Sequence, residues 1–424
     1  MLDINLIFNN IDKIIQKLSN KHFKLDIKKI NTKENNRKKI QIFKENLQAK
    51  RNKYIKEITL LKLNKKNTEN LNIIVNNLNK KINIFKLKLY SLKKEIYDYM
   101  ISIPNIHEDD VPVGFNSNSN VEIKYVGKKR KFNFPIKDHL SIGKISNEID
   151  LKSATQITGT KFVVLKGNIA KMHRALIQFM LDIHINNHNY KEYYLPYLIN
   201  QDSLYGTGHL PKFKNDLFNI KKVNNQIYYL IPTGEVPLIN ILKNKIFKEN
   251  ELPIKMVTHT TCFRLEAGSY GKINKGLLRM HQFDKIELIQ AVKPSKSKEA
   301  LEEITKHAEN ILKLLKLPYR KILLCTGELG FSSCKTYDLE VWLPSQKTFC
   351  EVSSCSNTGD FQSRRIKAIY KNVNQHKKFL HMLNGSGLAI SRTLAAIIEN
   401  YQLKDGHIKI PEVLKTYMNG LSII

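Results

Sequence analysis

Glycine and proline are absent from the first 100 residues, although the whole chain of 424 residues contains 18 Gly and 12 Pro. These two residue types punctuate ordinary folds, so their absence over this length argues against a domain made of short elements and tight turns. Residues 1–100 are therefore predicted to form long helices.

Cysteine is scarce, and long apolar runs are missing. The five cysteines form no Cys-x-x-Cys pair and no Cys/His cluster with the spacing of zinc ligands, so we expect reduced thiols and no structural zinc. No segment approaches about 20 consecutive apolar residues, and the first residues lack a basic start followed by an apolar run. These absences predict a cytoplasmic protein that is neither exported nor inserted in a membrane.

Acidic residues are few: 38 Asp and Glu face 70 Lys and Arg, for a net charge of +32. Such an excess favours a polyanionic partner, because clustered basic side chains displace counterions from phosphates. The chain is also rich in Asn and Ile, as an AT-biased coding sequence would produce, so the position of the charge is more informative than its total. Residues 1–100 carry 24 Lys and Arg against 9 Asp and Glu, nearly half of the net charge.

A heptad pattern runs through the second half of this stretch. Apolar residues alternate in steps of four and three, which is typical of a coiled coil, at Leu71, Val75, Leu78, Ile82, Phe85, Leu89, Leu92, Ile96 and Tyr99. A looser stripe precedes it at Ile40, Phe43, Leu47, Tyr54, Ile58 and Leu61. With the polar stretch 64–70 as its tip, the pattern predicts an antiparallel hairpin of two helices, each about 45 Å long. Its basic surface is equally compatible with a solvated structural coiled coil and with nucleic-acid binding.

The first prolines, in Ile103–Val113, mark a domain boundary. We assign residues 1–105 to an N-terminal domain and residues 106–424 to a second domain. In the second domain an amphipathic helix is predicted over residues 168–188, followed by a strand, YYLPYLIN, at 193–200. Further on we expect a strand over 336–343 and, over 384–402, a glycine turn capped by Ser386 that leads into a helix. Strands and helices without a βαβ rhythm favour an α+β fold.

The stretch Thr258–Glu287 concentrates the chemistry of the chain on a predicted two-stranded ribbon. Side chains two residues apart share a face of a strand, so charged and aromatic residues gather on one face: Arg264, Glu266, Phe283, Lys285 and Glu287. The opposite face is apolar, with Phe263, Leu265, Ile286 and Leu288. The connecting loop is expected to be mobile because of Gly268, Gly271 and Gly276. Taken alone, such a ribbon is more often an edge hairpin with an exposed salt-bridge ladder than a functional site.

Three segments resemble the motifs of the class II aminoacyl-tRNA synthetases, in the form carried by the seryl-tRNA synthetases. FRLEAGSYG with RMHQFDKIE resembles motif 2, the helix and strand around Pro196 resemble motif 1, and NGSGLAISRTLAAIIENYQ resembles motif 3. The resemblance extends over essentially the whole chain. It implies an antiparallel-sheet catalytic domain, an N-terminal antiparallel α-helical coiled-coil arm, and a homodimer built on motif 1.

The family resemblance also implies the reaction. Such enzymes activate L-serine with ATP and Mg²⁺ to seryl-adenylate, and then transfer serine to the 3′ end of tRNA(Ser), or of tRNA(Sec) where it exists. The helical arm of the family grips the long variable arm of the tRNA, while the acceptor end enters the catalytic domain. Backbone shape rather than base edges is read in this kind of recognition.

Activation of an amino acid needs arginines and a metal-binding carboxylate but no covalent nucleophile. By resemblance, Arg264 and Arg392 are catalytic, Arg264 binding the α-phosphate and the serine carboxylate. Glu266 accepts from the adenine amino group, Phe283 stacks on the ring, and Arg392 approaches the ring from elsewhere. The implied ATP site comprises Arg264, Leu265, Glu266, Met280, Phe283, Glu351, Val352, Ser353, Ser354 and Arg392.

Glu351 and Ser354 resemble the metal-ligating pair of the family. On an ideal strand they face opposite ways, so sharing one ion requires a bulge or a strand end between them. The implied serine site comprises Thr233, Gly234, Glu235, Arg264, Glu287 and Ser386. The sequence departs from the family at Gly234, where alanine is common, and at Cys350, where a basic residue is common.

Two rival functions remain compatible with the sequence. One is a class II synthetase for another amino acid, and the other is a degenerate synthetase-like protein that only binds RNA. Two further segments are rejected as functional motifs: KPSKSK at 293–298 lacks the partners of the class I lysine loop, and the GTG and GSG segments are too short for dinucleotide fingerprints.

Overall fold

The computed structural model describes residues 1–223, 226–266 and 276–424. Their contacts divide the chain into two units, one formed by residues 1–22 and 104–424 and the other by residues 23–103. The domain boundary assigned at residues 105/106 from sequence stays a prediction. No helix in these described ranges combines the length and the apolar character needed to cross a bilayer.

Residues 1–100 form four helices, so the expectation of only two is wrong. Two short ones, α1 (Ile4–Asn9) and α2 (Ile11–Ser19), precede the long pair. Asn10 separates them with φ −142° and ψ 47°, and Asp3 caps α1 by accepting from the backbone of Asn5. Asn and Asp side chains compete with helical hydrogen bonds, so they end helices without glycine or proline.

Unit 2 is the predicted hairpin of α3 (Ile27–Leu63) and α4 (Glu69–Met100). The heptad on α4 is confirmed, because all nine of its positions are buried or half-buried while their neighbours are almost all exposed. Asp26 accepts from the backbone of Lys29 and caps α3, and its own backbone N–H donates to the Tyr99 hydroxyl at 2.9 Å. The two helices therefore meet at the base of the hairpin as well as along its seam.

The stripe expected on α3 is only partly right. Phe43 is 51% exposed, although its ring centroid lies 4.8 Å from that of Phe85. Nearer the base, Glu34 is buried and accepts two hydrogen bonds from Arg37, at 2.7 and 2.6 Å. A polar pair that satisfies its own hydrogen bonds can occupy a seam position, and an apolar-periodicity search does not detect it.

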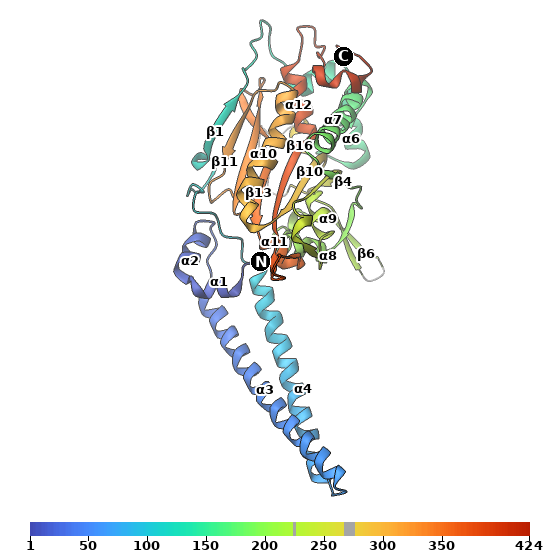
Figure 1. Ribbon diagram of the computed structural model, residues 1–424. Coiled ribbons are helices and arrows are strands. Elements are labelled where there is room, and N and C mark those ends of the chain that lie inside the picture. The colour runs from blue at the N-terminus through green and yellow to red at the C-terminus, as the bar shows by residue number, and fades with distance from the viewer. Residues whose placement is uncertain (224–225, 267–275) are drawn as a thin grey trace. The chain divides into compact units, whose positions relative to one another are not determined.

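Unit 1 is built on an eight-stranded sheet with the order β1-β11-β12-β13-β16-β10-β9-β4 (Figure 1). All pairs are antiparallel except β4 with β9, and the predicted α+β fold is confirmed. Helices α7, α10 and α12 pack their apolar faces on the sheet and enclose the main core. The strands of this sheet are β1 (Val121–Val126), β4 (Lys191–Glu192), β9 (Ile254–Phe263), β10 (Gln282–Val292), β11 (Tyr319–Leu323), β12 (Lys335–Leu343), β13 (Thr348–Gly359) and β16 (His381–Ala389).

Smaller elements surround this sheet. The helices of the unit are α5 (His139–Ile145), α6 (Leu151–Thr158), α7 (Gly167–Asn186), α8 (Gln201–Thr207), α9 (Glu235–Asn240), α10 (Ser297–Leu314), α11 (Phe361–Ile366) and α12 (Ile390–Asn400). The minor strands are β2 (Ile149–Asp150), β3 (Val164–Leu165), β5 (Leu198–Asn200), β6 (Asn219–Val223), β7 (Gln226–Leu230), β8 (Ile246–Lys248), β14 (Ile369–Lys371) and β15 (Lys377–Phe379).

The strand expected at 193–200 is wrong over most of its length. The chain leaves β4 at Glu192 and re-enters a strand only at Leu198, in β5, so Pro196 lies in the connection. Proline has no backbone N–H for a sheet ladder, which explains the break. The preceding helix is confirmed as α7, and its predicted residues Ile169, Met172, Leu176 and Phe179 are buried.

The glycine turn expected at 384–389 is also wrong, because these residues belong to strand β16 and the helix α12 begins only at Ile390. A Cβ on Gly385 would lie 3.0 Å from Cys355 Sγ, and one on Gly387 would lie 2.8 Å from Ile286 Cγ2. These glycines therefore permit close packing inside the sheet, which explains a pattern that resembles a turn in the sequence.

His184, in the last turn of α7, makes folding sensitive to acid. Its side chain is fully buried, and burial lowers its pKa to about 3. An unfolded chain protonates histidine near pH 6.5, so the stability due to neutral His184 is complete above this pH and is lost as the pH falls from 6.5 towards 3. Because of His184, we expect the free energy of unfolding to fall by about 2 kcal/mol when the pH is lowered from 7 to 5.

Urea denaturation at pH 7 and pH 5 measures this effect. His184→Gln should flatten the pH dependence by about that amount, while His376→Gln, at an exposed loop position, should leave it unchanged. Equal pH dependence in both variants would contradict the prediction.

Candidate active site

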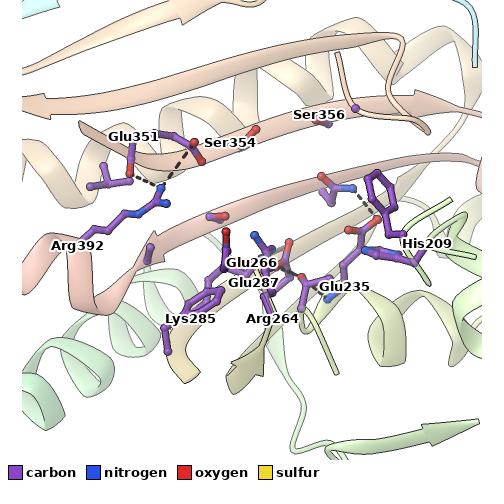
Figure 2. A pocket seen from close by; sticks show the side chains of 18 of the residues that line it. His209, Glu235, Arg264, Glu266, Lys285, Glu287, Glu351, Ser354, Ser356 and Arg392 are labelled. Atoms are coloured by element: carbon purple, nitrogen blue, oxygen red, sulfur yellow. Dashed lines mark hydrogen bonds and ion pairs between the residues drawn. The ribbon is translucent and has the colours of Figure 1, made fainter. Parts of the chain in front are cut away.

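One cavity of about 490 Å³ lies against strands β10, β13 and β16 of the eight-stranded sheet (Figure 2). Its remaining walls come from segments far apart in the sequence: residues 207–213, 233–235, 264–266, 277–283 and 330–333. Twelve of the fifteen residues assigned from sequence to the ATP and serine sites line this cavity.

Two buried carboxylates, Glu235 and Glu287, line the part of the cavity away from Glu351 and Arg392 (Figure 2). Glu235 stands at the start of α9 and accepts from Gln362 Nε2 at 2.7 Å and from Asn384 Nδ2 at 2.9 Å. Glu287, on β10, accepts from Thr233 Oγ1 at 2.8 Å. Desolvation raises the pKa of both carboxyl groups. Such groups gain from a partner that supplies positive charge or donated hydrogen bonds.

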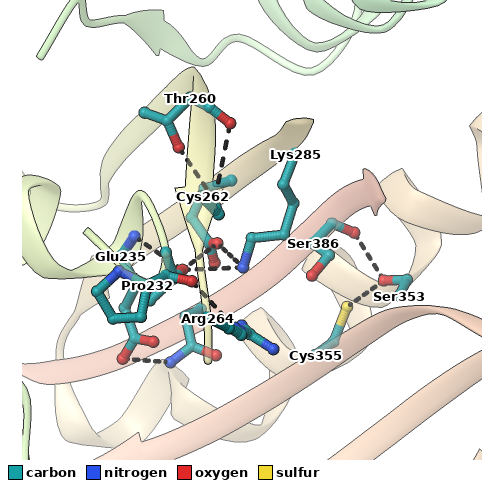
Figure 3. A network of polar contacts seen from close by, with 12 residues as sticks. Pro232, Glu235, Thr260, Cys262, Arg264, Lys285, Ser353, Cys355 and Ser386 are labelled. Carbon is teal, nitrogen blue, oxygen red and sulfur yellow. Dashed lines mark hydrogen bonds and ion pairs between the residues drawn. The ribbon is translucent and has the colours of Figure 1, made fainter. Parts of the chain in front are cut away.

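Ser386 and Lys285 complete this end of the cavity. Ser386 is the cross-strand neighbour of Glu287 in the β10–β16 pair. Lys285 is only 7% exposed, donates from Nζ to Thr233 Oγ1 at 2.8 Å and forms an ion pair with Glu287 (Figure 3). The sequence placed Lys285 on the charged face of the ribbon but assigned it no role.

Arg264 lies at the centre of the cavity. Its Nε donates to the Pro232 carbonyl at 3.0 Å, and its guanidinium carbon lies 5.2 Å from the centroid of the Phe283 ring. Within the described ranges Arg264 has no carboxylate within ion-pair distance. The hydrogen bond to Pro232 therefore fixes the Arg264 side chain and leaves its guanidinium available to an anionic ligand.

Arg264 and Glu266 do not project from a strand, because β9 ends at Phe263. The backbone of Arg264 still donates to the His281 carbonyl, but that of Leu265 donates to Asp216, so the chain turns away from the ladder. Glu266 has φ +50° and accepts from Arg279 Nε at 2.6 Å. The predicted ribbon of β9 and β10 is thus confirmed. The prediction that Arg264 and Glu266 project from its first strand is wrong.

A β-bulge sets the geometry at the other end of the cavity. In the β12–β13 pair, Leu339 faces Ser353 while Glu340 faces Glu351, so Val352 is an extra residue in the ladder. The bulge cancels the alternation of sides, and Glu351 and Ser354 both line the cavity. The bulge that the sequence analysis required for Glu351 and Ser354 to face one ion is therefore present.

Arg392, at the start of α12, lies beside the same bulge. It donates from Nη1 to the Glu351 carbonyl at 2.8 Å and from Nε to the Leu278 carbonyl at 3.0 Å. Its Nη1 is 3.6 Å from Glu351 Oε2. Figure 2 shows Arg392, Glu351 and Ser354 at the opposite end from His209 and Glu235. Positive charge and hard oxygen donors thus share this end.

Three residues assigned to the site from sequence do not line the cavity. Ser353 is buried behind the sheet face and donates to the Ser386 carbonyl at 2.6 Å, and Leu265 contributes its backbone to the bond with Asp216. Gly234 precedes α9, and a Cβ there would lie 2.8 Å from Thr258 Cγ2. Met280, Phe283 and Val352 do line it. Gly268 and Gly271, expected in a mobile loop, lie outside the described residues.

Sequence reasoning missed the segment Thr207–His209, which lines the cavity. The overlapping GTG sequence at residues 206–208 was considered only as a dinucleotide fingerprint. His209 Nδ1 and Thr207 Oγ1 share a hydrogen bond of 2.8 Å. Burial, together with the charges of Arg264 and Lys285, lowers the pKa of His209 to about 3. Gln362 and Asn384 were missed as well, because neither amide has a local signal for its bond to Glu235.

Comparisons with known proteins agree with this architecture. Residues 218–401 match the model of the tRNA synthetase class II core domain (G, H, P, S and T), and residues 1–107 match that of the seryl-tRNA synthetase N-terminal domain. A serine–tRNA ligase of Baumannia cicadellinicola subsp. Homalodisca coagulata is 55% identical over 429 residues, covering 100% of both chains.

Solved structures give the same result. A seryl-tRNA synthetase from Pyrococcus horikoshii, complexed with ATP, has a TM-score of 0.91 at 32% identity and covers 100% of this chain and 99% of its own. A cytoplasmic serine–tRNA ligase from Naegleria fowleri, in complex with AMP, has a TM-score of 0.88 at 27% identity and covers 100% and 98%. With its sheet, its three motifs and a full-length relative of this identity, the chain belongs to the seryl-tRNA synthetases, the serine–tRNA ligases among the class II aminoacyl-tRNA synthetases.

Proposed function

We propose that this cavity performs both steps of serine–tRNA ligation with a division of work between its ends. ATP and L-serine first form seryl-adenylate and pyrophosphate, and the adenylate then gives serine to the terminal adenosine of tRNA(Ser), or of tRNA(Sec) where it exists. The observation that carries the proposal is the arrangement in one cavity of two buried carboxylates, the central Arg264, and the Glu351–Arg392 end.

The carboxylates at the Glu235–Glu287 end fit the ammonium and hydroxyl groups of serine. Arg264, in the centre, fits both the serine carboxylate and the α-phosphate, since a guanidinium spans two oxygens. It would hold the attacking carboxylate in line with phosphorus and offset the negative charge that develops there. Phe283 offers its ring to adenine, and Arg392 offers its guanidinium to the same base. In the second step the ribose hydroxyl of the tRNA attacks the carbonyl carbon and AMP leaves.

Glu351 and Ser354 fit a magnesium ion, because carboxylate and hydroxyl oxygens are the hard donors that Mg²⁺ takes. The described residues contain no group of three or more His, Cys, Asp or Glu able to hold a metal. We therefore propose that ATP oxygens complete the coordination, so that the ion arrives with the nucleotide. Bound there, the ion would neutralise charge on the phosphates.

We further propose a cytoplasmic homodimer whose helical arm binds the variable arm of the tRNA. Among the described residues, strand β4 is an open edge of the eight-stranded sheet, and Tyr194 next to it is 94% exposed, which together support a partner on the side of motif 1. Residues 23–103 carry 21 Lys and Arg against 7 Asp and Glu, which supports contact with RNA phosphates. These assignments correspond to a tRNA-binding domain at residues 1–105 and a catalytic domain at residues 106–424.

Serine-dependent ATP–pyrophosphate exchange tests the proposed function. We expect exchange with serine and little with any other amino acid. Efficient exchange with a different amino acid would favour the rival synthetase, while no exchange with any amino acid, in protein that still binds tRNA, would favour the degenerate RNA-binding protein.

Arg264→Ala should lower the rate of serine activation more than about 100-fold, or about 3 kcal/mol of transition-state stabilisation, because a preorganised charge partner is lost. Its fold should survive, since the side chain makes only one hydrogen bond to a described residue. Arg320→Ala, which removes ion pairs to Glu340 and Glu122 outside the cavity, is the control. Near-normal exchange by the Arg264 variant would show that the α-phosphate lies elsewhere.

A further inference from the structure

Lys285 is a buried cation inside the cavity for which the reaction described above has no use. Its Nζ donates to Thr233 Oγ1 at 2.8 Å and pairs with Glu287 Oε2, and Thr233 Oγ1 donates to the same Oε2 at 2.8 Å. The three side chains thus form a closed ring at the serine end, in which Lys285 is labelled in Figure 3. Because β10 carries both Lys285 and Glu287 on one face, the strand itself holds the pair in register.

The two carboxylates at this end differ in how their charge is balanced. Glu235 Oε1 accepts from two neutral amides, Gln362 and Asn384, and within the described part of the chain Glu235 forms no ion pair. Glu287, in contrast, already has a cation. Burial raises the pKa of Glu235 overall, although the charges of Lys285 and Arg264 lower it without a direct ion pair. A buried carboxylate with no directly paired cation gains most from an incoming one, so the serine ammonium is drawn more strongly to Glu235.

Glu287 keeps one oxygen for the substrate. Its Oε2 is occupied by Thr233 and Lys285, while no described residue donates to Oε1. An acceptor whose charge is already offset has less attraction for an ammonium and remains suited to a neutral hydroxyl donor.

We propose that Lys285 is a positioning residue for serine specificity, which neutralises Glu287 and fixes its Oε2 so that Oε1 receives the serine hydroxyl and the ammonium goes to Glu235. This inference rests on the proposed function of the cavity. It assigns to the two carboxylates different parts of the same small substrate.

Without Lys285 the acceptor would be lost in one of two ways. Glu287 would compete for the ammonium, or it would take up a proton, because burial already raises the pKa of Glu287 and Lys285 opposes that rise. Three other titratable groups act on or face Glu287: the Glu235 carboxyl, which raises the pKa further, and the thiols of Cys262 and Cys355, whose own pKa values are raised by burial. The thiols are therefore neutral across the working range of pH.

The test is serine-dependent pyrophosphate exchange by Lys285→Met and by Lys285→Gln, which keeps a donor to Thr233 but no charge. We expect the KM for serine to rise at least about 50-fold with a smaller change in kcat, and the preference for serine over alanine to fall at least about tenfold. The acid limb of kcat/KM should move to higher pH, since Glu287 is protonated more readily. Lys285→Arg should restore much of the loss.

Lys321→Met is the matched control. Lys321 is also buried, at 5% exposure, and pairs with Glu302 at 2.8 Å on β11, outside the cavity. It should leave the serine KM, the selectivity and the acid limb unchanged. Melting temperatures of all variants separate loss of function from loss of fold, and Lys285→Arg remains informative if the neutral variants do not fold.

The double variant Lys285→Met/Glu287→Gln decides whether Lys285 acts through Glu287. Its serine KM should be no higher than that of Glu287→Gln alone, because the residue through which Lys285 acts is already altered. Multiplying effects would overturn the proposal, and so would a Lys285→Gln enzyme with the serine KM, selectivity and pH profile of the wild type. Inactivity of the wild-type protein with serine would instead contradict the proposed function itself.

Discussion

We expect the intact protein to activate serine about 10⁴-fold more efficiently than alanine, because a site built to hydrogen-bond a hydroxyl leaves its own polar atoms unpaired when that group is missing. Glu287 and Ser386, which are cross-strand neighbours, should carry this preference. The Glu287 side chain is 3% exposed, so water cannot easily replace the missing hydroxyl. Pyrophosphate exchange with each amino acid at saturating ATP measures the ratio.

Replacing both residues, as Glu287→Gln with Ser386→Ala, should lower the preference at least about 100-fold, mainly by weakening the use of serine. Glu302→Gln, which disturbs the ion pair with Lys321 outside the cavity, serves as the control. If the double variant kept the wild-type preference for serine, the hydroxyl would have to bind elsewhere in the cavity. Glu235 would then be the first residue to examine.

The second large effect is expected from shortening the helical arm. Residues 38–91 can be replaced by a short glycine-serine turn, because Asn36 and Leu92 line one groove. The shortened arm keeps Arg37, the partner of buried Glu34, and the ion pair of Lys33 with Glu95. Adenylate formation should persist, since every described residue that lines the cavity belongs to unit 1. The kcat/KM for tRNA should fall at least about 10³-fold, mainly through KM, as phosphate contacts are lost.

Salt dependence and a charge variant separate the role of charge from that of shape. The kcat/KM for tRNA of the full chain should decrease steeply with added salt, and that of the shortened protein much less. A full-length protein with Lys50, Lys53 and Lys56, all exposed on α3, replaced by Gln should lose part of the tRNA efficiency and none of the exchange activity. Normal charging of tRNA by the shortened protein would show that the arm is structural and that its basicity reflects a lysine-rich composition.

The sequence by itself determined the features that depend on neighbours along the chain. The absence of glycine and proline, with the four-three repeat on α4, predicted the helical hairpin, because side chains three and four residues apart meet on one helix face. The same holds for α7 and for the face of β10 that carries Phe283, Lys285 and Glu287. The motif letters also placed most of the cavity residues, since family resemblance retains chemistry at matching positions.

Only the tertiary structure decided which of these groups meet and in what state. Glu235 is held by amides 127 and 149 residues away, and His209 enters the cavity from a segment with no signal of its own. The bulge at Val352 follows from the pairing of β13 with β12, and the strand at 384–389 follows from pairing with β10 and β13. Pairing partners are not encoded in a local pattern. The sequence also does not show how charge is balanced, because it contains two glutamates of equal formal charge. In the fold, Lys285 forms an ion pair with Glu287, whereas Glu235 has no ion pair with any residue that the structure describes.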